Sequence, residues 1–258
     1  MEDLKSDMTY DFIPPDGKEF AGKSVRVTPS LICADMDNLK GQIRDFSSLG
    51  MEFLHVDMID GAFSPSLPLT FDELDKIRHS LSMPLDFHIM AMDNEQYVRR
   101  ALEFIPMQVC FHLETALHAD RLLNIIKSAN VRCGVALTPT TPVTSLEYAV
   151  DICDFVLLML INPGYASAAG ETQVPYAERK VRDCHEFIQK HNRDIPIEVD
   201  GRVSFQSIPG LVAAGADILV AGTSSLFHRN GSLAENYRQI ARAVRAGLNA
   251  RHDCEEVR

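Results

Sequence analysis

The sequence predicts an α/β protein that folds as a single (β/α)8 barrel with eight parallel strands. Eight short apolar segments recur at fairly even intervals, and each is followed by a stretch with helical periodicity. A chain of 258 residues has the usual length of one such barrel, and 46% apolar residues suffice for one large core. Because no glycine-rich dinucleotide fingerprint follows the first strand, a closed barrel is favoured over an open, doubly wound sheet.

The strands are predicted from runs of apolar residues bounded by polar or turn-forming ones. They span residues 25–32, 52–59, 84–91, 107–114, 132–138, 155–161, 196–202 and 218–224.

Helix boundaries between these strands carry capping signals. In a capping box, a Ser or Thr oxygen accepts from a free helix N–H, and a Glu three residues later reaches back. The pairs that match this spacing are Thr70 with Glu73, Thr144 with Glu147, and Ser232 with Glu235. Gly50 and Gly215 are predicted to end helices, because glycine adopts the left-handed conformation after a helix most easily.

Three segments lie outside the regular repeat. Residues 1–23 are polar with Pro and Gly, so we expect an N-terminal arm before a barrel domain of residues 24–250. Its last helix is predicted at Leu233–Ala250, which leaves residues 251–258 as a C-terminal tail. Residues 162–174 lengthen one interval with small residues, which predicts a mobile loop over the barrel mouth.

Composition narrows the partners and the compartment. A net charge of −11 without a long basic run argues against nucleic-acid binding. The N-terminus has no apolar signal region, and the run at 155–161 is too short to span a bilayer, so we expect no membrane partner. The six cysteines are scattered without a close pair, which indicates a reducing cytoplasm. We also expect a homo-oligomer, although no sequence feature specifies one.

Chemistry-bearing side chains gather at predicted strand ends. His55 and Asp57 alternate on the second strand and so share one side of it, while His88 and Asp200 end the third and seventh strands. Two imidazoles and two carboxylates suit one divalent ion such as Zn²⁺, Mn²⁺, Fe²⁺ or Co²⁺. Any one of them alone is more simply a hydrogen-bonded structural group. Four together in one barrel mouth favour a cation, since two buried carboxylates do not readily both stay ionised.

The ordered motifs resemble the ribulose-phosphate 3-epimerase family. The strings are PSLICAD, HVDMIDG, DFHIM, LTPTTP, LMLINPG, EVDG and VAGTSSLF, and they run from about residue 28 to 228. The resemblance implies an isomerase on a (β/α)8 barrel that acts on a small sugar phosphate in carbohydrate metabolism. The reaction would be epimerisation at C3 of a ketose phosphate of the ribulose 5-phosphate/xylulose 5-phosphate type.

The family pattern also implies residue roles. His55, Asp57, His88 and Asp200 would hold the metal, and an enediolate would form when the C3 proton leaves. Inversion at C3 needs a base on one face and an acid on the other, roles that Asp57 and Asp200 fit. The remaining candidates would bind substrate: Ser30, Met90, Met159, Gly164, Gly201, Arg202, Gly222, Thr223 and Ser224. For the two methionines, ordinary barrel core is an equally good reading.

The phosphate-binding region departs from the family. The usual NPGFGGQ lid is NPGYASAAG at residues 162–170, so two glycines that would allow close backbone approach to phosphate are replaced. Arg202 stands where a second glycine is common, either as a charged fork for phosphate or as a surface arginine. The segment Gly222–Ser224 keeps the phosphate position at the end of strand eight.

These departures leave the substrate open. One alternative is a hexulose-phosphate 3-epimerase, acting for example on allulose 6-phosphate, toward which the GTSSLF string leans slightly. Another is a sugar-phosphate binding barrel without turnover, against which the retention of all four metal-type residues argues.

Overall fold

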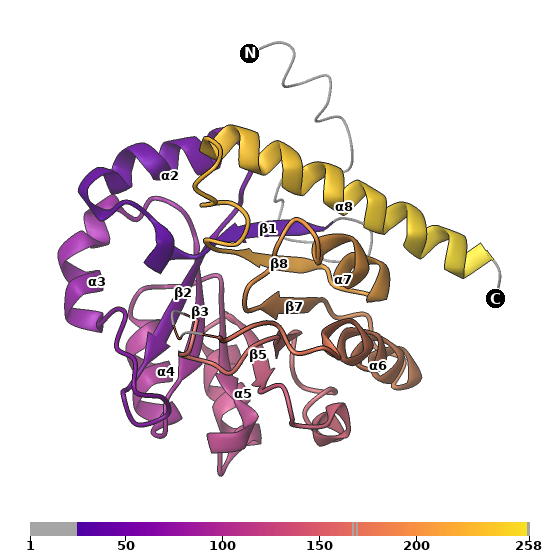
Figure 1. The fold of residues 1–258 in the computed structure, drawn as a ribbon. Helices are drawn as coiled ribbons and strands as arrows, with labels where there is room; N and C mark the ends of the chain where they lie inside the picture. The colour runs from indigo at the N-terminus through magenta and orange to yellow at the C-terminus, as the bar shows by residue number, and fades with distance from the viewer. Residues whose placement is uncertain (1–24, 167, 169, 257–258) are drawn as a thin grey trace.

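The protein, seen in a computed structural model, forms one eight-stranded parallel sheet that curls into a barrel (Figure 1). The structure describes residues 25–166, 168 and 170–256, so the predicted arm at residues 1–23 lies outside the described part. The strand order is β1-β8-β7-β6-β5-β4-β3-β2, and a bridge between Ser30 and His55 joins the two end strands. The strands are β1 (Arg26–Pro29), β2 (Leu54–Ile59), β3 (Leu85–Met90), β4 (Gln108–His112), β5 (Arg132–Leu137), β6 (Phe155–Met159), β7 (Ile197–Asp200) and β8 (Ile218–Ala221).

Helices surround the barrel, as the prediction of repeated βα units requires (Figure 1). The α-helices of the described part are α2 (Leu39–Ser48), α3 (Phe71–Ile77), α4 (Asn94–Leu102), α5 (Ala119–Ser128), α6 (Ala177–Lys190), α7 (Ile208–Ala214) and α8 (Leu233–Glu256). Short 3-10 helices span Leu31–Cys33, Met36–Asn38, Arg78–Ser80, Leu113–Thr115 and Val143–Leu146. No helix among the described residues combines the length and the apolar character needed to cross a membrane.

All eight strands occur within the predicted segments, and the predicted (β/α)8 barrel is confirmed. Strands β5, β6 and β8 begin at the predicted first residue and the other five begin after it. Strand β2 ends at the predicted last residue, and the other seven end earlier, because strand pairing stops where the mouth loops begin. Gly50 and Gly215 have φ of 84° and 122°, as expected of residues that follow helices.

Two of the three capping boxes form. Thr70 with Glu73 and Ser232 with Glu235 exchange the reciprocal hydrogen bonds of the motif. The Thr144 prediction is wrong: β5 is followed by the 3-10 helix Val143–Leu146 instead of an α-helix. Pro142 occupies the N-cap position there, so Thr144 already lies inside the turn.

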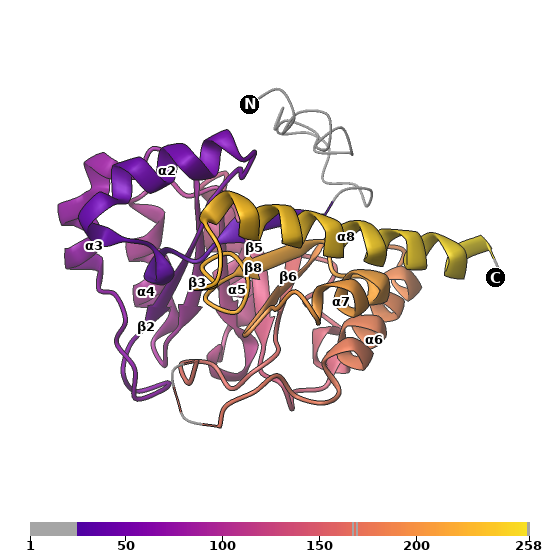
Figure 2. The same ribbon diagram turned by 45° about the horizontal axis from the view of Figure 1, so that its top comes forward.

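Helix α8 continues to Glu256, past position 250 where the sequence predicts its end. Arg251 fastens this extension, because its guanidinium donates to the carbonyls of Val212 and Ala216 and pairs with Asp217 at 3.1 Å. Helix α8 packs against the much shorter α7, which lies beside part of it in both ribbon views (Figures 1 and 2).

The core has two parts. A large apolar cluster fills the space between strands and helices, and a smaller one includes Phe155, Leu157 and Met159, which alternate along β6. Alternation along a strand places these three on the opposite face from the helix-packed residues, that is, inside the barrel. The apolar interior gives the charged residues at the mouth a rigid floor.

The loops after β2 and after β6 approach each other at one end of the barrel (Figure 2). They meet at Gly164, whose backbone passes so near that an added Cβ would lie 2.6 Å from the Cβ of Ser64. Gly164 has φ of 83°, a conformation that favours glycine. The loop predicted to cover the mouth therefore packs closely on the loop after β2.

Candidate active site

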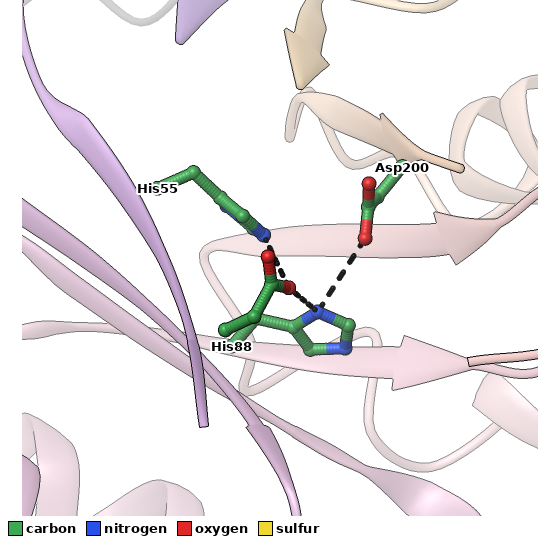
Figure 3. Close-up of side chains that lie close together, drawn as sticks. His55, His88 and Asp200 are labelled. Carbon is green, nitrogen blue, oxygen red and sulfur yellow. Dashed lines mark hydrogen bonds and ion pairs between the residues drawn. The ribbon is translucent and has the colours of Figure 1, made fainter. Parts of the chain in front are cut away.

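His55, Asp57, His88 and Asp200 converge at the mouth of the barrel. Figure 3 labels three of them, His55, His88 and Asp200, whose side chains point toward one another. Their potential ligand atoms all lie within 4.8 Å of one another. His88 Nδ1 is 3.2 Å from Asp57 Oδ1 and 3.7 Å from Asp200 Oδ2, while His55 Nε2 is 3.3 Å from Asp57 Oδ1. The structure thus brings together four side chains that the sequence singled out from three separate strands.

The register of β2 and β3 produces this cluster. Asp57 is paired with His88, and His55 with Asp86 two residues deeper along the strands. Because residues two apart share a face, Asp57 and His88 lie level with each other, and His55 lies level with Asp86 below them. From that deeper position His55 still reaches the cluster through Nε2.

His55 is held from below by two buried acids. Its Nδ1 lies 2.7 Å from Asp86 Oδ2 and 3.1 Å from Glu198 Oε1, and all three side chains are fully buried. Burial lowers the pKa of His55, but the charges of Asp57 and Asp86 outweigh it and raise the pKa well above the usual value. Burial and then the charge of Asp86 raise the pKa of Glu198 well above its usual range.

The two mouth aspartates have different environments. Burial raises the pKa of Asp57, but His55 and His88 outweigh it and hold the pKa well below its usual value. Burial and the neighbouring Asp57 carboxylate raise the pKa of Asp200 to about 6. Ser30 donates a hydrogen bond to Asp57 Oδ2 at 3.2 Å, which turns Oδ1 toward the histidines.

The donor set fits a divalent cation. His55 Nε2 is buried and makes no hydrogen bond within the described part of the chain, although Asp57 Oδ1 lies 3.3 Å away. Two carboxylates crowd the histidines, so positive charge at this point is favourable, as the raised pKa of His55 indicates. Two imidazole nitrogens and two carboxylate oxygens are ligands that Zn²⁺, Mn²⁺, Fe²⁺ and Co²⁺ accept.

On the side away from the aspartates, His88 contacts a row of two further polar residues, His112 and Glu114. Its Nε2 lies 3.0 Å from Nε2 of His112 at the end of β4, and His112 Nδ1 lies 3.1 Å from Glu114 Oε2. Burial, the first cause, and His88 lower the pKa of His112 to about 4 against the opposing effect of Glu114. Burial raises the pKa of Glu114, but hydrogen bonds from His112, Thr141 and the Thr138 backbone N–H lower it to about 2.

A cavity of about 310 Å³ opens above the four residues, a volume in the range of small-ligand pockets. Asp57 and Asp200 reach its floor. All the side chains and glycines predicted to bind substrate lie in its wall: Ser30, Met90, Met159, Gly164, Gly201, Arg202, Gly222, Thr223 and Ser224. Their role in binding stays a prediction, but the structure places them around one space.

Arg202 has a third arrangement, different from either sequence-based reading. Its Nη2 donates to the carbonyl of Ala166 in the lid loop at 2.8 Å, while the residue also lines the cavity. Its φ is 50°, a left-handed conformation consistent with the glycine common there in the family. The guanidinium therefore links β7 to the lid, and its other N–H groups remain near the space where a substrate would lie.

Sequence reasoning missed the residues behind the histidines. They are Asp86, Glu198 and His112 on strands, and Glu114 in the 3-10 helix after β4. Each lies two positions from another polar residue of the site. The alternation that identified His55 and Asp57 would have placed Asp86 with His88 and Glu198 with Asp200. Applied to strand four, it would also have marked His112.

Comparison with known proteins bears on the activity. The model of the ribulose-phosphate 3 epimerase family matches residues 26–227. Ribulose-phosphate 3-epimerase of Bacillus subtilis (strain 168) is 32% identical over 201 residues, covering 78% of this chain and 91% of that protein. The Escherichia coli (strain K12) protein of the same name is 30% identical over 227 residues, covering 88% and 97%.

Solved structures agree on the fold. The 3-hexulose-6-phosphate synthase of Salmonella typhimurium superposes with a TM-score of 0.61 at 13% identity, over 86% of this chain and 100% of that one. A tryptophan synthase structure from Mycobacterium tuberculosis gives a TM-score of 0.59 at 12% identity, over 86% and 93%. At such identities the likeness speaks for the barrel alone.

Proposed function

This chain belongs to the ribulose-phosphate 3-epimerase family, and from that premise we propose that it inverts C3 of a pentulose phosphate, interconverting ribulose 5-phosphate and xylulose 5-phosphate. The observation that carries the proposal is the placement of Asp57 and Asp200. Both carboxylates reach the floor of one cavity, from β2 and β7, two strands that are not neighbours in the barrel. Inversion of a carbon centre needs two such groups.

The aspartates divide the proton transfer. One carboxylate removes the C3 proton from one face of the sugar, and the other returns a proton to the opposite face. Which of them acts first depends on the epimer that enters. Ser30 keeps Asp57 oriented by its hydrogen bond to Oδ2, so the carboxylate meets the substrate in one position.

His55, Asp57, His88 and Asp200 would hold one divalent cation. Bound there, it would supply a Lewis acid for the negative charge that develops on the substrate oxygens when C3 loses its proton. The identity of the ion is open among Zn²⁺, Mn²⁺, Fe²⁺ and Co²⁺, since the donor set suits each of them.

The rest of the wall would orient the substrate. Met90 and Met159 offer apolar surface that keeps water from the reacting carbon, and the backbone at Gly222–Ser224 follows β8, where barrels of this kind usually hold phosphate. Gly164, Gly201 and Arg202 line the same cavity.

The proposal is tested by offering the purified protein a series of pentulose and hexulose phosphates in deuterated water. Deuterium should enter C3 of ribulose 5-phosphate and xylulose 5-phosphate at comparable efficiency, and more slowly for hexulose phosphates. Faster exchange with allulose 6-phosphate would reassign the substrate, and no exchange with any ketose phosphate would leave a barrel that binds without turnover.

The cellular setting is part of the same proposal. The five cysteines whose side chains the structure describes are all free thiols, which supports a reducing, cytoplasmic location. The sugar phosphate is the expected partner, and a homo-oligomer is expected as well. Light scattering of the purified chain, with and without a reductant, measures the oligomeric state.

A further inference from the structure

The row His88, His112 and Glu114 bears on which nitrogen of His88 faces the barrel mouth. His88 Nδ1 points at the two aspartates, and Nε2 points away from them toward His112. A neutral imidazole carries one hydrogen, so only one ring nitrogen offers a lone pair. If the four mouth residues hold a cation, as the proposed function requires, His88 must keep its hydrogen on Nε2.

At the Glu114 end of the row, the donor and the acceptor of the hydrogen bond are fixed. Glu114 Oε1 accepts from the backbone N–H of Thr138 at 2.7 Å and from the hydroxyl of Thr141. Glu114 Oε2 is left for His112, and a carboxylate at neutral pH only accepts. His112 Nδ1, 3.1 Å away, must therefore be the nitrogen that donates.

The hydrogen position on His112 then determines the hydrogen position on His88. With its hydrogen on Nδ1, His112 has a lone pair on Nε2, which lies 3.0 Å from His88 Nε2. Both rings are fully buried, so two facing lone pairs or two facing hydrogens would be costly. His88 Nε2 must donate, and Nδ1 is left to face the mouth.

We propose that Glu114 and His112 are positioning residues that set the tautomer of His88, so that its Nδ1 lone pair is directed at the cation site. Asp57 Oδ1, 3.2 Å from that Nδ1, would by itself favour a hydrogen there. The partner on the opposite nitrogen counteracts this preference. Phe63 holds the His112 ring in place, with its centroid 4.8 Å away.

His55 is oriented more directly. Its Nδ1 lies 2.7 Å from the Asp86 carboxylate, a single step from ring to acid. Among the described residues, His88 Nε2 faces an imidazole, and that imidazole in turn faces the Glu114 carboxylate. The tautomer of His88 therefore depends on a residue at the surface end of the row, Glu114, which touches neither substrate nor cation.

The first measurement reads the ring hydrogens directly. Two-bond ¹H–¹⁵N spectra of the protein, metal-free and zinc-loaded, identify the protonated nitrogen of each histidine. We expect His112 to carry its hydrogen on Nδ1, and His88 to carry one on Nε2, in both states. A hydrogen on His112 Nε2, or a zinc-loaded His88 with its hydrogen on Nδ1, would overturn the proposal without any variant being made.

The second measurement uses Glu114→Gln. Thr138 and Thr141 still require an acceptor, so the amide oxygen faces them and the amide N–H faces His112, which reverses the direction of the row. Zinc affinity, measured by competition with a chelating dye, should fall about 10- to 100-fold. The matched control is Glu147→Gln, which makes the same change opposite His191 in a surface pair 3.6 Å apart, and it should keep wild-type zinc affinity.

The result separates this inference from the proposed function. Unchanged zinc affinity in a folded Glu114→Gln variant, with C3 exchange intact in the wild type, refutes the positioning role and leaves the epimerase proposal standing. A wild type that shows the expected ring hydrogens but no C3 exchange refutes the epimerase proposal, while the positioning role of Glu114 and His112 stands.

Discussion

Replacement of Gly164 by alanine should impair the enzyme far more than the same replacement at Gly170. Both glycines lie in the loop after β6, and their φ angles are 83° and 82°. A Cβ on Gly164 would lie 2.6 Å from the Cβ of Ser64 and closer still to its hydroxyl oxygen, whereas a Cβ on Gly170 would meet no atom of the described residues within 4 Å. The pair therefore separates a steric effect from a backbone effect.

The size of the expected difference in activity follows from subtracting the cost that both variants share. An L-residue in the left-handed region costs roughly 1–2 kcal/mol, and this cost is common to both. Only Gly164→Ala adds overpacking, since Ser64 is 4% exposed and has little room to move. Overpacking typically costs about 1–3 kcal/mol, and if that strain falls on the closed loop it lowers kcat/KM by a further 5- to 150-fold or so.

The assay is kcat/KM for the best ketose phosphate, with the thermal midpoint measured alongside. The kcat/KM of Gly164→Ala should be lower than that of Gly170→Ala by the stated factor. Adding Ser64→Gly to the Gly164→Ala variant should recover most of this difference in kcat/KM. Ser64→Gly alone serves as the baseline for that recovery. Equal kinetics in the two alanine variants would mean that the contact between the loops has no part in catalysis.

Three further outcomes are expected at the mouth. Purified protein should contain close to one divalent ion per chain by elemental analysis, and chelation should abolish C3 exchange until metal is restored; full turnover without metal would contradict the cation site. Asp57→Asn and Asp200→Asn should each lower kcat by about 10²–10⁴ with an unchanged circular dichroism spectrum, and near-normal turnover in either would remove that residue from the acid/base pair. Arg202→Ala should raise KM about tenfold or more with little change in metal content, because one guanidinium both holds the carbonyl of Ala166 and lines the cavity. An unchanged KM at low and high ionic strength would assign phosphate binding to other groups.

The fold was predictable because its signal is local. Strand and helix periodicities repeat along the chain, and each can be recognised within about a dozen residues. The exception has a local cause too, since Pro142 starts the turn after β5 and displaces Thr144 from the cap position. Alternation likewise placed His55 and Asp57 on one side of their strand.

What could not be predicted depends on contacts between distant loops. Arg202 had two sequence-based readings, phosphate or solvent, and the structure gives it a backbone carbonyl 36 residues earlier. Ser64 and Gly164 meet although neither lies in a periodic segment. Such contacts are set by how far each loop reaches across the mouth, and residue type alone does not encode that distance.

The register between β2 and β3 decides which of two aspartates is the candidate metal ligand. Strand β2 reads His55-x-Asp57 and β3 reads Asp86-x-His88, so alternation alone makes either carboxylate a candidate ligand. The pairing of His55 with Asp86 and of Asp57 with His88 places Asp57 at the mouth and Asp86 one layer deeper. There Asp86 bonds His55 Nδ1 instead of facing the cavity, which leaves Nε2 for the mouth. A shift of two residues between these strands would place Asp86 opposite Asp57, or His88 opposite His55, while leaving the same motifs in the sequence. The metal set is therefore a property of the barrel as much as of the motifs.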